Sequence, residues 1–270
     1  MTRYKAVIEY DGTPYVGFQV QKNGPSVQES LQHGLYKMSK GQKINVHGSG
    51  RTDSGVHAHG QVVHFDYPVA MKTDNLLRAW NAVTADSIRI RSVSEVEETF
   101  HARYHAQGKH YRYWVDLAKF PSPFQTNYVL HHPYPCDYER MNQALQAVVG
   151  EHNFKSFCST KTDKTNFVRR IDKAQVTLDE HTGLLVFDFI GNGFLYNMVR
   201  ILVGTSLQIG DGLRPTDEMI RLIAAQDRNE AGPTAPGHGL YLEEVYYPNR
   251  KTRDKQYAQW LAYRQQQEKS

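Results

Sequence analysis

The sequence predicts an α+β protein built from two units, each with helices on one side of an antiparallel sheet. Three observations support this class. Strand-like and helix-like segments recur with a similar inventory in both halves of the chain. A polar stretch around residues 98–108 separates the halves. The length of 270 residues is also comfortable for two domains of about 100–150 residues each.

The first half has the order strand, helix, strand, strand, helix, strand. Its clearest helix spans 26–39, where apolar residues recur at helical spacing and Ser26 and Glu29 are placed as a capping box. The other expected elements are a helix near 73–83 and strands at 3–10, 43–47, 60–66 and 87–93. We expect these elements to form an N-terminal domain over residues 1–103.

The second half repeats this inventory, and we expect a C-terminal domain over 104–249. Strands are expected near 104–116, 168–178, 184–190 and 239–247, and helices at 137–149, 194–209 and 216–226. The remaining tail, 250–270, is charged and rich in glutamine. It places four residues at helical spacing: Tyr257, Trp260, Leu261 and Arg264.

The composition is that of a globular protein with a mildly basic balance. Hydrophobic residues make up 40% and charged residues 22%, and the net charge is +4. No apolar run reaches the roughly 18 residues of a membrane span, and the N-terminus shows no secretory signal. Cys136 and Cys158 form no CxxC pair, so we expect two reduced thiols in a cytosolic protein without membrane association.

The loop "GSGRTDSGVHAH" at residues 48–59 places one aspartate in flexible, glycine-rich backbone. The Asp53 carboxylate is suited to be a general base, a metal ligand or a covalent nucleophile. Its glycines permit the close approach of a ligand or another backbone segment. The alternative is an Asx turn at Asp53 with Arg51 as a surface charge, and the loop alone does not exclude it.

Three histidines follow in and after this loop, and they raise the question of a metal site. His57 and His59 alternate, so they could share one face of a strand, and His64 lies farther along the same segment. No glutamate or cysteine lies nearby, and this spacing is common by chance. We therefore expect ordinary strand and loop histidines and no bound metal.

The segment "FHARYHAQGKHYRYW" at 100–114 interleaves tyrosines with basic residues and has no acid. Aromatic rings beside cations are typical of sites for single-stranded or looped RNA. The alternative is an amphipathic strand with Tyr111 and Tyr113 packed inside and Arg112 in solvent. Two further basic clusters are each typical of a solvated face: Lys161, Lys164, Arg169, Arg170 and Lys173, and Arg250, Lys251, Arg253 and Lys255.

The segment "GNGFLYNMVRILVG" at 191–204 predicts a helix that is apolar on most of its circumference, which indicates burial. Arg200 lies on its narrow polar stripe. A guanidinium in such surroundings needs a carboxylate or phosphate partner. Arg200 would either hold a catalytic aspartate ionised and correctly oriented, or be a structural arginine that reaches another acid or solvent at the helix edge.

Six short motifs together resemble the tRNA pseudouridine synthase A family. They occur in the order of that family and cover nearly the whole chain up to about residue 247. The most specific is "GRTDSGVHA" at 50–58. The others are "EYDG" (9–12), "YVGFQ" (15–19), "FHAR" (100–103), "KHYRY" (109–113) and "FLYNMVR" (194–200).

The resemblance implies a cytoplasmic homodimer that converts uridine to pseudouridine in the tRNA anticodon stem-loop, at tRNA positions 38–40. It implies two RRM-like (ferredoxin-like) domains with a cleft between them and neither metal nor organic cofactor. The catalytic aspartate of the family falls on Asp53, its active-site tyrosine on Tyr111 and its aspartate-pairing arginine on Arg200. Arg51 matches the arginine that displaces the target base.

Retaining a detached uracil favours a closed apolar pocket, for which Phe194, Val199 and Leu240 are candidate wall residues. Two other functions remain open from the residues alone: a non-catalytic RNA-binding protein with two RRM-like halves, and a hydrolase that releases the base. The sequence does not locate dimer contacts. A helix over 257–264 in the tail would contribute to them or pack on its own domain.

Overall fold

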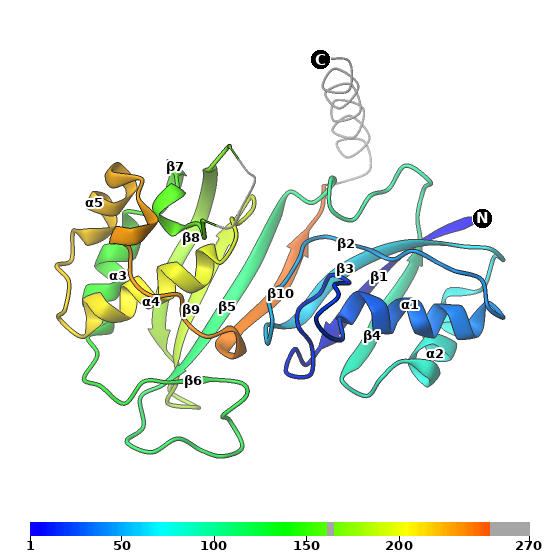
Figure 1. Ribbon diagram of the computed structural model, residues 1–270, viewed down its shortest axis with the longest axis horizontal. Coiled ribbons are helices and arrows are strands. Elements are labelled where there is room, and N and C mark those ends of the chain that lie inside the picture. The colour runs from blue at the N-terminus through cyan, green and yellow to red at the C-terminus, as the bar shows by residue number, and fades with distance from the viewer. Residues whose placement is uncertain (161–164, 249–270) are drawn as a thin grey trace. The chain divides into compact units, whose positions relative to one another are not determined.

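The computed structural model describes residues 1–160 and 165–248 (Figure 1). The described chain divides into two compact units, one comprising Met1–Gln107 and residues 242–248, the other Gly108–Tyr241. The predicted domain ranges, 1–103 and 104–249, stay a prediction. Lys161 and Lys164, the basic cluster at 250–255 and the predicted tail helix over 257–264 lie outside the described residues.

The first unit is a small antiparallel sheet with two helices. Strand β1 (Thr2–Tyr10) lies between β4 (Ile88–Glu95) and β3 (His57–Tyr67), and the short β2 (His47–Gly48) pairs with β3. Helices α1 (Val27–Met38) and α2 (Thr73–Val83) lie on the same face of this sheet (Figure 1). The expected order of elements is therefore confirmed.

Strand β10 (Leu240–Tyr246) starts in the second unit and continues into the first, where it lies beside β3. Contacts along its length hold it there. His59 Nδ1 lies 3.0 Å from a Glu243 carboxylate oxygen. The Tyr246 carbonyl accepts a hydrogen bond of 2.9 Å from the Gln107 amide. A Cβ on Gly60 would lie 2.2 Å from the Glu243 carbonyl oxygen, so the backbones approach closely at that glycine.

The core of the first unit follows from alternation in β1 and helical spacing in α1. Tyr4, Ile8 and their alternate neighbours in β1 are buried, as are Leu31 and Leu35 of α1. Helix α1 begins after Ser26, whose hydroxyl accepts a hydrogen bond of 3.3 Å from the Glu29 amide, as the capping box predicts. Trp80 of α2 is fully buried.

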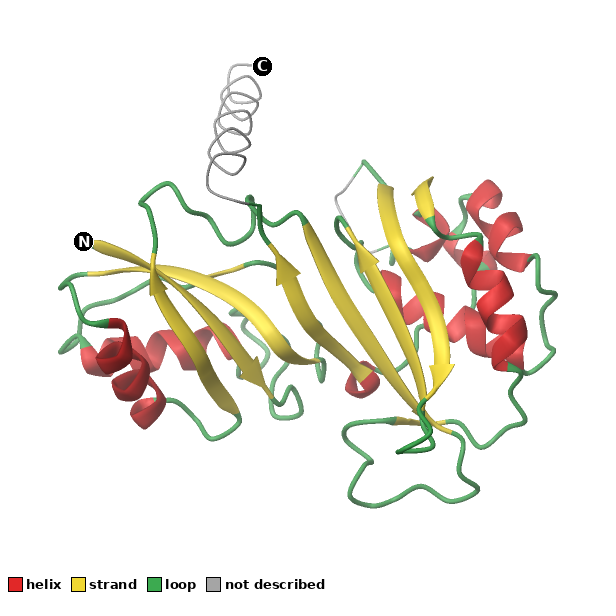
Figure 2. Cartoon of the chain, turned by 180° about the vertical axis from the view of Figure 1, so that it is seen from behind, coloured by secondary structure: helices red, strands yellow, loops and turns green. Residues whose placement is uncertain are grey.

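The second unit has a sheet with the strand order β5 (Gly108–Asp116), β9 (Leu185–Gly191), β8 (Val168–Leu178) and β7 (Gly150–Asn153), all paired antiparallel. The short β6 (Leu130–His131) pairs with β5 in parallel. Helices α3 (Tyr138–Gln146), α4 (Met198–Gly210) and α5 (Glu218–Ala225) gather on one face of this sheet (Figure 2). Three short 3₁₀ helices span Lys155–Phe157 (η1), Arg228–Glu230 (η2) and Gly237–Gly239 (η3).

The described chain is thus a mixed α/β fold with mostly antiparallel strand pairs and five α-helices. Three predicted boundaries are wrong. The strand expected at 43–47 is reduced to two residues at His47–Gly48, and the strand expected from 104 begins at Gly108. The helix expected from 194 begins at Met198, because Asn197 has a φ of 61°, a left-handed conformation outside the helix.

Two further expectations concern the cysteines and membrane-spanning helices. Cys136 and Cys158 are both free thiols. Among residues 1–160 and 165–248, no helix combines the length and the apolar character that a membrane crossing needs.

Three histidine rings lie in contact in the first unit, with His47 stacked on His64 and His101 tilted against both, a feature the sequence did not suggest. The centroid of the His64 ring lies 4.9 Å from that of His47 and 4.5 Å from that of His101. The Nδ1 atom of His64 accepts from the Ala102 amide, at 3.1 Å. Burial, followed by neighbouring charges, lowers the pKa of His64 to about 3 and that of His101 to about 4.

These shifts predict that acid destabilises the first unit. An unfolded histidine titrates near 6.5, whereas the folded rings stay neutral well below it, so below pH 6.5 the unfolded state binds more protons. This contribution is complete above pH 6.5 and is lost as the pH falls toward the folded pKa values. Beside the rings, the Arg3 ion pair lowers the pKa of Asp66, which adds a loss of the same sign at still lower pH.

Urea unfolding from about pH 8 to about pH 4.5 measures this effect. We expect the free energy of unfolding to decrease as the pH falls, and to decrease less steeply in His101→Gln. The matched control is His33→Gln on the exposed side of α1, which should keep the wild-type slope. A stability that is flat over this pH range would contradict the prediction.

Candidate functional site

The loop that carries Asp53 connects β2 to β3, and a buried glutamine anchors its first half. The Ser49 hydroxyl donates to Gln61 Oε1 at 2.6 Å, and Gln61 Nε2 donates to the Gly50 carbonyl at 3.2 Å. The Ser49 amide also donates to the Val62 carbonyl at 2.8 Å. Gln61 is fully buried in β3, so these bonds lie away from water and fix the entry into the loop.

The residue before Asp53 is held by both its backbone and its side chain. The Thr52 carbonyl accepts from the Phe18 amide at 3.1 Å, and the hydroxyls of Thr52 and Tyr10 lie 2.9 Å apart. Burial raises the pKa of Tyr10 well above its usual range, so this phenol stays protonated. Asp53 is half-buried, and its carbonyl accepts from the Val56 amide at 3.2 Å, which closes the turn.

Two glycines let the segment 12–18 pack directly against this loop. A Cβ on Gly12 would lie 2.1 Å from the Val56 carbonyl oxygen. Gly17 has a φ of 120°, and a Cβ there would lie 2.8 Å from the Thr52 carbonyl oxygen. The Gly12 amide also donates to His57 Nδ1 at 3.0 Å. These contacts explain why the motifs at 9–12 and 15–19 accompany the Asp53 loop in the sequence.

The three histidines of this segment have separate surroundings. His57 is buried against Gly12 and lies 3.2 Å from Asp11, while His59 is exposed beside Glu243. His64 is stacked on His47 and lies in tilted contact with His101. Arg51, two positions before Asp53, is exposed.

In the second unit, Tyr111 lies on β5 and is 7% exposed. Its ring packs edge-on against Phe194, with the centroids 5.2 Å apart. Tyr113, on the same face, is fully buried and donates to the Pro236 carbonyl at 2.8 Å. Arg112 instead lies 3.1 Å from an oxygen of Asp188. The amphipathic alternative therefore describes this strand, except that Arg112 is paired with an acid.

Arg200 lies in the first turn of α4 and is half-buried. Its Nε donates to the Ala235 carbonyl at 2.6 Å, and its Nη1 donates to Asn197 Oδ1 at 3.0 Å. The Ala235 amide returns a bond of 3.1 Å to the Arg200 carbonyl. The guanidinium is thus aimed by the turn before α4 and by the segment that leads to η3, a support that the sequence did not reveal.

Of the three candidate wall residues of the apolar pocket, Val199 is 4% and Leu240 is 5% exposed, and Phe194 is half-buried on the Tyr111 ring. Asp53 and Arg51 belong to the first unit, whereas Tyr111, Arg200 and Leu240 belong to the second.

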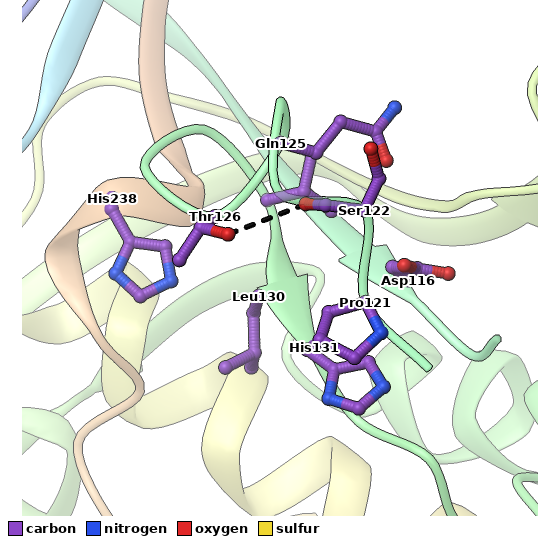
Figure 3. A pocket seen from close by; sticks show the side chains of 9 residues that line it. Asp116, Pro121, Ser122, Gln125, Thr126, Leu130, His131 and His238 are labelled. Carbon is purple, nitrogen blue, oxygen red and sulfur yellow. Dashed lines mark hydrogen bonds between the residues drawn. The ribbon is translucent and has the colours of Figure 1, made fainter. Parts of the chain in front are cut away.

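A separate pocket of about 250 Å³ lies within the second unit (Figure 3). Thr126 donates to the Ser122 carbonyl at 3.3 Å on its rim. Burial lowers the pKa of His238 on its wall, so that ring is neutral at pH 7. None of the predicted site residues lines it. The lining residues are Asp116, Pro121, Ser122, Gln125, Thr126, Val129, Leu130, His131 and His238.

The contact at Gly12 yields a prediction. Gly12→Ala places a methyl group on the Val56 carbonyl, so we expect the free energy of unfolding to decrease by about 1–3 kcal/mol. Gly193→Ala is the matched control, because its Cβ would lie 3.8 Å from the nearest side-chain atom. Urea unfolding measures both variants. Equal stability of the two would show that segment 12–18 does not press on the loop.

The chain matches the family described as tRNA pseudouridine synthase over residues 6–105 and 144–248. Two curated relatives are named tRNA pseudouridine synthase A. That of Geobacillus sp. (strain WCH70) is 49% identical over 92% of this chain and 99% of its own, and that of Latilactobacillus sakei subsp. sakei (strain 23K) is 48% identical over 91% and 98%.

Arg51, Asp53, Arg200 and Leu240 lie inside the matched ranges, and Tyr111 lies between them. Among solved structures, "Crystal Structure of a Cbf5-Nop10-Gar1 Complex" aligns with a TM-score of 0.38 and 13% identity, covering 92% of this chain and 51% of that one. That likeness is too weak to inform fold or function. The family match and the relatives are sufficient: this chain belongs to the tRNA pseudouridine synthase family.

Proposed function

We propose that this protein isomerises uridine to pseudouridine in the anticodon stem-loop of tRNA, at tRNA positions 38–40. The observation that carries the proposal is the rigid mounting of Asp53. Its loop is fastened to β1 and β3 through Tyr10 and Gln61, inside a range that matches the family. The relatives named tRNA pseudouridine synthase A extend over 92% of the chain, so the match is not confined to one motif.

The proposed reaction breaks the bond between uracil N1 and the ribose C1′, turns the base and forms a bond between C5 and C1′. The C5 proton is lost and N1 gains one, so no electrons and no group are supplied from outside. A carboxylate performs such a step as a nucleophile. Asp53 would attack either C1′ of the sugar or C6 of the base. The chemistry requires neither a metal nor an organic cofactor.

Arg200 is proposed to hold the Asp53 carboxylate. The bonds to Ala235 and Asn197 anchor the guanidinium through Nε and Nη1. Such anchoring fixes the plane of the group, and a planar fork suits a carboxylate. The pairing would keep Asp53 ionised and oriented toward the base.

Tyr111 and Leu240 are proposed to hold the flipped uracil. The target base must leave its stack, which costs a few kcal/mol. A tyrosine ring fixed by Phe194 offers a flat face for the base, and its hydroxyl could help to move the C5 proton. Leu240, with Phe194 and Val199, would supply the apolar wall. Arg51 is exposed beside Asp53 and is proposed to fill the place that the base leaves.

The resemblance to the family also leads us to propose a homodimer that works in the cytoplasm. Two free thiols agree with a reducing compartment. Two domains of RRM type with the active site in a cleft between them belong to the same proposal.

The role of Asp53 is tested by replacing its carboxylate with an amide of the same shape. Asp53→Asn should lower the release of tritium from tRNA labelled at uracil C5 by at least about 10³-fold, because it removes the nucleophile. Binding of the tRNA, measured by gel shift, should survive. Full activity in the variant would overturn the assignment of Asp53.

The wild-type products in this assay separate the alternative functions. Affinity for tRNA without any release of tritium would favour a non-catalytic RNA-binding protein. Free uracil in the products would favour a hydrolase.

The role of Arg200 is tested by a change that keeps the charge. Arg200→Lys should lower kcat/KM about 10–100-fold and move the acidic limb of the pH–rate profile to higher pH, because the carboxylate loses its two-pronged partner. Arg221→Lys, in the ion pair with Glu218 on α5, is the matched control and should leave both quantities unchanged. An unshifted pH profile in Arg200→Lys would contradict the pairing with Asp53.

A further inference from the structure

Three side chains with metal-binding atoms meet at the C-terminal end of α4. His132 follows β6, Cys136 precedes α3 and Asp211 ends α4. One imidazole nitrogen, the sulfur and one carboxylate oxygen all lie within 4.8 Å of one another. All three residues lie within the second unit and none takes part in the proposed reaction. They form a cluster, His132–Cys136–Asp211, that the family resemblance does not account for.

The donor atoms of this cluster suit zinc. Zn²⁺ accepts nitrogen, thiolate and carboxylate ligands at about 2.0–2.3 Å in tetrahedral geometry, which places ligand atoms roughly 3.3–3.8 Å apart. In the cluster, His132 Nε2 and Asp211 Oδ1 are 2.8 Å apart, and the widest separation is within 4.8 Å. Zinc binding would move the imidazole and the carboxylate slightly apart and bring the widest pair closer. All three residues are half-buried, so water can reach a fourth position.

The electrostatics of the helix end favour a cation there. A helix carries partial negative charge at its C-terminus, and an acidic group at that position is unfavourable unless a positive charge balances it. Asp211 is the C-cap of α4, a helix of 13 residues, and its own amide donates back to the Leu207 and Ile209 carbonyls. Its carboxylate therefore adds negative charge to the negative end. A bound metal ion would supply the balance.

Backbone and packing contacts hold the three residues in place. The His132 amide donates to the Asp116 carbonyl at 2.8 Å. The Asp137 amide, directly after Cys136, donates to the Gly210 carbonyl at 3.0 Å and so ties the cysteine to the end of α4. A Cβ on Gly210 would lie 2.6 Å from the Cys136 sulfur, so a glycine is needed there. This preorganisation lowers the entropy that a bound ion must overcome.

We propose that His132, Cys136 and Asp211 form a site for a divalent, thiophilic cation of the zinc type. The ion joins the segment before α3 to the end of α4, the helix whose first turn carries Arg200. Its role is structural, and the proposal does not depend on the proposed function. On binding, the Cys136 thiol gives up its proton to solvent and a sulfur–metal bond forms, without oxidation or reduction.

Two further side chains border the cluster. Tyr134 packs against His132, and Met141 Sδ lies 4.0 Å from the Cys136 sulfur.

Titration of the untagged full-length protein with Co²⁺ and Zn²⁺ tests the site. We expect one Co²⁺ per chain and a thiolate-to-cobalt charge-transfer absorption band, which added Zn²⁺ removes by competition. Zn²⁺ should also raise the Tm, because it binds the folded state. Absence of the charge-transfer band at saturating Co²⁺, at about pH 8, would overturn the proposal whatever the variants do.

Variants show which side chains hold the ion. Cys136→Ser should abolish the charge-transfer band, and Asp211→Asn should weaken Zn²⁺ binding by more than the roughly 10–100-fold caused by losing an outer partner. Cys158→Ser, which removes the other thiol, is the matched control and should keep the band and the affinity. Loss of the band in Cys158→Ser, with retention in Cys136→Ser, would place the metal elsewhere and overturn the proposal. Circular dichroism confirms that each variant is folded.

Discussion

The buried hydrogen bond between the hydroxyls of Tyr10 and Thr52 is the constraint on which the Asp53 loop depends. Ordering flexible backbone costs about 1–2 kcal/mol for each residue, and glycine loses more than any other. The loop contains three glycines between Gly48 and Gly55, so it stays ordered only where neighbouring elements hold it. Strand β1 supplies Tyr10, β3 supplies Gln61, and segment 12–18 covers the turn. The glycines allow neighbouring segments to pack closely against the loop, and these contacts hold Asp53 in place.

In the second unit, contacts with neighbouring residues likewise fix the candidate site residues Arg200 and Tyr111. Asn197, directly before α4, adopts a left-handed backbone conformation. Its side-chain Oδ1 accepts a hydrogen bond from Arg200 Nη1. The Ala235 carbonyl accepts a hydrogen bond from Arg200 Nε, so a long side chain with many rotamers is reduced to one direction. Phe194, in the segment that precedes α4, packs edge-on against the ring of Tyr111. Each unit therefore holds its own candidate site residues in place through contacts within that unit, and preorganisation of this kind would favour the proposed reaction.

The sequence predicted what depends on local pattern. Helical spacing and the Ser26 cap located α1, and alternation placed Tyr111 and Tyr113 on the packed face of β5. It failed where one residue's backbone decided the outcome: the apolar stretch from Phe194 suggests a helix, and the φ of Asn197 delays it to Met198. It also missed contacts between distant residues. Neither the contacts among the rings of His47, His64 and His101 nor the Ala235 support of Arg200 leaves a periodic pattern in the sequence. The roles proposed for Asp53 and Arg200 came from motifs, because the residues alone left a turn at Asp53 and a structural arginine at position 200 open as alternatives.

The position of β10 in the sequence delays the completion of the first unit's sheet during synthesis. The strand begins after residue 239, yet it completes the sheet of a unit whose other strands end by Glu95. Until the ribosome has passed Tyr246, the edge of β3 that contacts Glu243 has no neighbour, and the Gln107 amide lacks its acceptor on Tyr246. An open strand edge invites pairing with other chains. The N-terminal unit is thus synthesised first, but its sheet is completed last. The second unit can therefore fold before it.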